Sequence, residues 1–143
     1  MGLKFGTNTI ATNGDYAKFG TNNLDIVKFS STNVWEKQTT PTLSQPTEFE
    51  WSWYDNGGHV QGFFGFRNPN PVTVTASIYA YLENSIDSYE ESYTVQIASN
   101  AWFDTDASGH SIGIDGETYD YLSIEIIFSA TGYQDSPTFN YDE

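Results

Sequence analysis

The 143-residue chain contains no cysteine and few cations. Without thiols it can form neither a disulfide nor a thiolate metal site, and cysteine catalysis is excluded. Only five residues are lysine or arginine against nineteen acids, which gives a formal charge of −14. Nucleic-acid binding depends on cations that displace counterions from phosphates, so this composition argues against a nucleic-acid partner.

Long apolar runs are also missing. No segment approaches the length of about 20 residues that a membrane helix needs, and residues 1–6 lack the apolar core of a secretion signal. Gly6 stands where a myristoylation signal requires serine or threonine. We therefore expect a soluble chain that binds no membrane and is not exported by a standard signal. Aromatic residues make up 17% of it and charged residues another 17%, a composition that favours strands over a helical bundle or a disordered tail.

Residues that would support catalysis are scarce. The two histidines, His59 and His110, stand in or beside glycine-containing loops, and neither has a recognisable serine or aspartate context. Catalysis requires a nucleophile with its base, paired carboxylates in a cleft, or a metal. We therefore expect no enzymatic activity, no catalytic residue and no cofactor.

Charge is distributed unevenly along the chain. Residues 1–38 carry four lysines against three acids, a net charge of +1, whereas the rest carries Arg67 alone against sixteen acids, a net charge of −15. An almost neutral segment followed by a strongly acidic one suggests that the two parts have different roles.

A short repeat occupies the N-terminal segment. It reads Lys4-Phe5-Gly6-Thr7-Asn8, then Lys18-Phe19-Gly20-Thr21-Asn22, then the weaker Lys28-Phe29-Ser30-Ser31-Thr32-Asn33. Each copy reads as a strand, a turn and a returning apolar segment, which predicts a small β-meander. Isolated hairpins are marginally stable in water, so we expect this segment to pack on something else.

Residues 39–46 are rich in threonine and proline and lack periodicity, which predicts a linker. Beyond them, apolar and polar residues alternate, most clearly over residues 72–82 and 121–130. About seven short strands separated by turn signals are typical of an immunoglobulin-like sandwich. The predicted fold is therefore all-β, with an N-terminal β-meander (1–38), a linker (39–46) and an Ig-like β-sandwich (47–143).

One loop has the spacing of calcium ligands. Asp104, Asp106, Ser108 and Asp115 match the oxygen positions of a twelve-residue calcium loop, although the last position is aspartate rather than glutamate and no helices flank the loop. A plain turn between strands produces the same residues. Both interpretations remain open.

Aromatic side chains offer a second candidate. Tyr79 and Tyr81 lie on the polar face of their predicted strand, where they could stack on sugar rings. Trp51 and Trp53 share a face with Phe49, and such a stripe is more often core than platform. The residues around Tyr119 to Ile124 resemble the tyrosine corner of Ig-like sandwiches, a folding feature.

The N-terminal copies, which end in Val34-Trp35, resemble segments common in structural proteins of tailed bacteriophages. The stretches Phe66 to Asn70 and Ser129 to Tyr133 resemble Ig-like domains of virion and bacterial surface proteins. The resemblance implies a non-enzymatic virion protein, such as a capsid decoration, a head fibre or a tail adaptor, present in many copies or as a homo-oligomer. Its partners would be other virion proteins, and a glycan of the host surface could be bound through Tyr79 and Tyr81. The expected assembly interface comprises Lys4, Phe5, Lys18, Phe19, Lys28, Phe29, Val34 and Trp35.

Overall fold

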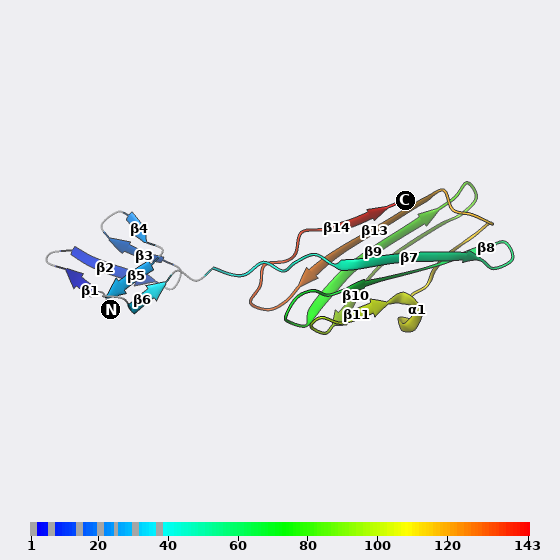
Figure 1. The fold of residues 1–143 in the computed structure, drawn as a ribbon. Helices are drawn as coiled ribbons and strands as arrows, with labels where there is room; N and C mark the ends of the chain where they lie inside the picture. Colours follow the sequence, from blue (N-terminus) through cyan, green and yellow to red (C-terminus); the bar gives the residue numbers. More distant parts are fainter. Residues whose placement is uncertain are drawn as a thin grey trace. The chain divides into compact units, whose positions relative to one another are not determined.

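A computed structural model describes residues 39–143 in full and, within residues 1–38, the backbone of six strands. The chain divides into two compact units, Met1–Thr40 and Pro41–Glu143. We describe each unit by itself. Both are built from antiparallel strands (Figure 1), so the all-β prediction is confirmed.

The N-terminal unit is a series of hairpins, as its repeats predict. Four strands pair in chain order into one sheet, and two more form a separate hairpin. The strands are β1 (Leu3–Phe5), β2 (Asn8–Asn13), β3 (Tyr16–Phe19), β4 (Asn22–Leu24), β5 (Ile26–Phe29) and β6 (Thr32–Glu36).

The first two repeats have the same register. Phe5 pairs with Asn8 in the first, and Phe19 pairs with Asn22 in the second. The third repeat has one extra residue before its asparagine, and its register shifts between Val27 and Lys28. The ladder therefore absorbs the extra residue as a β-bulge.

The second unit is an Ig-like sandwich of two antiparallel sheets. Its elements are β7 (Thr47–Asp55), β8 (His59–Arg67), β9 (Val74–Glu83), β10 (Ser88–Ile97), β11 (Trp102–Asp104), α1 (Thr105–Ser108), β12 (Ile112–Asp115), β13 (Tyr121–Ser129) and β14 (Phe139–Asp142). One sheet has the order β10-β9-β13-β14. In the other, β8 is central, with β7 on one edge and β11 and β12 in succession on the opposite edge. Pairs of consecutive strands thus alternate between the two sheets, as in an Ig-like sandwich.

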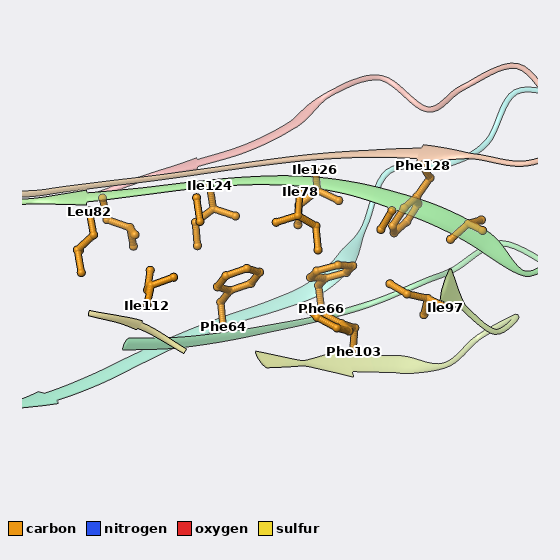
Figure 2. Close-up of a cluster of buried hydrophobic side chains, with 14 of the residues drawn as sticks. Phe64, Phe66, Ile78, Leu82, Ile97, Phe103, Ile112, Ile124, Ile126 and Phe128 are labelled. Atoms are coloured by element: carbon orange, nitrogen blue, oxygen red, sulfur yellow. The ribbon is translucent and has the colours of Figure 1, made fainter. Parts of the chain in front are cut away.

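The core lies between these two sheets. Figure 2 shows Ile78, Leu82, Ile124, Ile126 and Phe128 of one sheet facing residues of the other. The facing residues include Phe64, Phe66, Phe103 and Ile112. Buried and solvent-facing residues alternate along β9 and β13, so the period-two pattern places the predicted apolar face inward. Each large buried side chain contributes about 1.5–3 kcal/mol of hydrophobic free energy.

The three large rings of β7 share a face as predicted, but they are buried to different extents. Phe49 and Trp51 are half-buried and pack against the core, whereas Trp53 is 41% exposed. Trp51 lies over Gly62, where a Cβ atom would come within 2.0 Å of the indole. Trp53 lies closer to the end of its strand, so the opposite sheet covers it less.

The linker prediction is wrong for residues 41–46. Leu43 is 2% exposed and belongs to the core, and its N–H donates to the carbonyl of Gln134. The backbone of Ser44 exchanges two hydrogen bonds with the side chain of Asn70. One apolar side chain among polar neighbours carries no periodic signal, so the packing of this segment cannot be predicted from the sequence pattern.

The three-residue strand β11 was not predicted either, because it is too short to show alternation. Within the residues that the structure describes, no helix has the length and apolar character needed to cross a membrane.

Candidate functional site

The four predicted calcium ligands do not converge. Asp104 lies opposite Gly65 and Asp115 lies opposite His59, six positions apart along β8. At about 3.3 Å per residue, this separates the two carboxylate positions by about 20 Å. The intervening residues fold into the short turn of α1 and then rejoin the sheet, so the calcium-loop interpretation is wrong.

The carboxylate of Asp104 has a structural role instead. It accepts a hydrogen bond from the backbone N–H of Asp106 at 2.8 Å and caps α1, while Ser108 donates to the carbonyl of Thr105. Among the residues that the structure describes, no group of three or more histidine, aspartate or glutamate side chains could hold a metal ion.

The histidines occupy separate surroundings. His59 Nδ1 lies 3.1 Å from the carboxylate of Asp115, its cross-strand neighbour, and both side chains are exposed. His110 stacks on Tyr93 with ring centroids 4.2 Å apart. A surface cross-strand pair and an aromatic stack both have ordinary structural explanations.

Tyr79 and Tyr81 alternate with the buried residues of β9, so their side chains lie on the outer face of the four-stranded sheet. A third tyrosine, Tyr121 of β13, joins them, with its ring centroid 6.1 Å from that of Tyr81. Tyr121 was not predicted as a site residue because only the register between β9 and β13 brings it beside Tyr81.

Carboxylates surround these tyrosines. Tyr81 donates a hydrogen bond to Glu83, and this bond, with desolvation, raises the pKa of Tyr81 to about 12. Desolvation, followed by the charge of Glu90, raises the pKa of Tyr79. Both phenols are therefore neutral hydrogen-bond donors at physiological pH.

A depression of about 300 Å³ opens beside Tyr79 on this face. Its lining includes Ser77, Tyr79, Ser92, Thr94, Glu125 and Ile127. The tyrosine ring and the isoleucine offer an apolar surface, and the hydroxyls and the carboxylate offer hydrogen bonds. We define the outer face around Tyr79, Tyr81 and Tyr121 as the tyrosine face.

The residues of the predicted assembly interface lie on strands of the N-terminal unit. They are Lys4 and Phe5 of β1, Lys18 and Phe19 of β3, Lys28 and Phe29 of β5, and Val34 and Trp35 of β6. Their side chains lie outside the part of the chain that the structure describes, so their role stays a prediction.

No protein-family model and no curated protein matches the chain. Among solved structures, it is similar to the ASH/PapD-like domain of human CEP192 (PapD-like domain 7), with 11% identity and a TM-score of 0.44. That match covers 81% of this chain and 94% of the other.

Proposed function

We propose that the chain is a non-enzymatic structural protein in which residues 1–38 attach it to a larger assembly and the acidic sandwich is displayed. In line with the resemblance of its repeats, we take that assembly to be the capsid or tail of a bacteriophage particle. The protein would then serve as a decoration, fibre or adaptor.

The observation that carries this proposal is the division of the chain. The N-terminal unit is made of short tandem hairpins and ends where a compact sandwich with its own core begins. A two-stranded hairpin such as that of β5 and β6 is at most marginally stable by itself in water, and a larger assembly would provide further packing. The net charges, +1 for residues 1–38 and −15 for the rest, favour contact through the first unit and solvation of the second.

The test compares the full chain with a fragment that begins at Pro41. Each is tagged and expressed while the particle is assembled, and purified particles are probed for the tag. We expect the fragment to fold, as judged by a cooperative thermal transition, but to be absent from particles. Equal incorporation of the fragment would overturn the attachment role, and absence of the full chain from particles would overturn the virion role.

A second candidate function is adhesion to carbohydrate through the tyrosine face. The observation that favours it is the clustering of three tyrosines beside the depression at Tyr79. Glycan binding should be lost in Tyr79→Ala and Tyr81→Ala. It should survive in Tyr79→Phe, which keeps the ring. Binding unchanged in both alanine variants would overturn a role for this face.

A further inference from the structure

A second cavity, of about 230 Å³, lies on the outer face of the other sheet. Strands β7, β8 and β11, with the start of α1, provide its walls. The lining includes Glu50, Ser52, Phe63, Trp102, Asp104 and Asp106. The described residues that line it include none of the tyrosine face.

The position of Trp102 depends on a glycine. The indole lies over Gly65, and a Cβ atom at that position would come within 2.6 Å of Cζ2 and 2.9 Å of Nε1. The backbone of Gly65 is not in the left-handed region, so this glycine is required by the space that the ring occupies. The sheet thus holds a tryptophan, half-exposed, at the wall of the cavity.

Two acidic residues flank Gly65 and the indole that covers it. Glu50 of β7 and Asp104 of β11 are both paired with Gly65 in the ladder. Neighbouring strands lie about 4.8 Å apart, which places the two acidic residues about 10 Å apart across the glycine. The Trp102 indole covers the middle of this row, and its two ends carry hydrogen-bond acceptors.

The acidic wall formed by β11 and α1 is fixed in place. Asp104 caps α1, and the hydroxyl of the buried Thr105 hydrogen-bonds to both the N–H and the carbonyl of Phe64. The carboxylate of Asp104 therefore has a restricted orientation before any ligand arrives, which lowers the entropic cost of binding.

We infer that this cavity binds a saccharide ring. A pyranose has an apolar face that can stack on an indole, and it carries hydroxyl donors on opposite edges that can reach carboxylates on both sides of that indole. A single ammonium group would also be attracted to Trp102, but it cannot reach acceptors that stand on both sides of Gly65. The placement of acidic residues on both sides of Gly65 therefore favours a pyranose ring over a single ammonium group.

This inference goes beyond the attachment role and does not depend on it. It also assigns sugar binding to a surface other than the tyrosine face. Loss of binding at the cavity would leave incorporation into particles unchanged, so the two proposals fail separately.

The experiment screens the full chain against an oligosaccharide array and measures Kd for the best ligand by calorimetry. We expect Trp102→Ala to weaken binding at least tenfold and Glu50→Gln to weaken it several-fold. Trp53→Ala, which removes a partly exposed tryptophan on the other face of β7, serves as the matched control and should bind like the parent. Glu50 is exposed and glutamine has the same shape, so Glu50→Gln remains informative if Trp102→Ala unfolds.

Three outcomes would overturn the inference. One is the absence of any saccharide ligand on the array. Another is unchanged affinity in both cavity variants. The third is binding of n-butylammonium, used as a probe, that competes with the saccharide and disappears in salt, because it would identify a cation site instead.

Discussion

The hydroxyl of Thr105 replaces backbone hydrogen bonds that are missing at one edge of β8, and we expect it to contribute substantially to stability. The edge of β8 is covered by β11 up to Gly65 and by β12 from Gly62. Between them the turn of α1 leaves Phe64 without a strand partner on that side. The Thr105 hydroxyl, fully buried, accepts from the N–H of Phe64 at 2.9 Å and donates to its carbonyl at 3.1 Å.

Thr105→Val keeps the shape of the side chain and removes both hydrogen bonds. A buried backbone group left without a partner costs about 1–3 kcal/mol, so two such groups are expected to cost ~2–5 kcal/mol. Thr105→Ser keeps the hydroxyl and loses one methyl group, which costs about 1 kcal/mol. A domain of this size has a total stability of about 5–15 kcal/mol, so the valine variant loses a large share of it.

Urea unfolding of the 41–143 fragment measures both variants against the parent. We expect the midpoint to fall much further for valine than for serine at an unchanged m-value, and the melting temperature of the valine variant to fall by about 10–20 °C. A valine variant as stable as the serine variant would refute the conclusion that the hydroxyl stabilises β8 through its hydrogen bonds to Phe64.

Four further outcomes are expected. A fragment that begins at Thr47 should be less stable than one that begins at Pro41, by at least ~1.5 kcal/mol in urea unfolding, because it lacks the buried Leu43. Equal urea midpoints for the two fragments would support the linker interpretation of residues 41–46. Asn70→Asp removes the amide that donates to Ser44 and Asn68, and it should expose the Leu43 amide to hydrogen exchange without unfolding the core. A Leu43 amide as protected as in the parent would show that the Asn70 side chain does not hold residues 41–46 in place. Because the pKa of Tyr81 is raised to about 12, the stability that its hydrogen bond to Glu83 contributes is full below pH 10 and is lost as pH rises through 12. Tyr81→Phe should therefore remove one late step from the phenolate absorbance titration, and an unchanged titration would contradict this. Millimolar calcium should leave the melting temperature unchanged, because Asp104 and Asp115 lie at separate positions along β8; a rise of several degrees would reopen the calcium interpretation.

The sequence predicts those elements whose signal is local. Strict alternation in β9 and β13 identifies both strands and their buried faces, because one face of each packs on the opposite sheet. The repeat likewise predicts the hairpins of the N-terminal unit. Leu43 and β11 escape detection because their burial depends on partners far along the chain, such as Gln134 and Phe66.

Candidate sites were predicted less well, and for the same reason. The calcium spacing of Asp104 and Asp115 is a local pattern, but the ladder with β8 separates the two residues. The tyrosine face could be predicted for Tyr79 and Tyr81, which share a strand, and not for Tyr121, which comes from another. The saccharide cavity has lining residues from three strands and α1, so only the register could reveal it.

The two glycines of β8 nevertheless carry a signal that the sequence contains. Glycine inside a strand usually weakens it, yet Gly62 and Gly65 both lie mid-strand, and neither has the left-handed backbone that would require glycine. Their odd spacing places them on opposite faces. Each lies under a tryptophan from a neighbouring strand, Trp51 on the inner face and Trp102 on the outer. In this chain, both mid-strand glycines of β8 therefore mark the position of an indole, and the outer indole, that of Trp102, lines the proposed saccharide cavity.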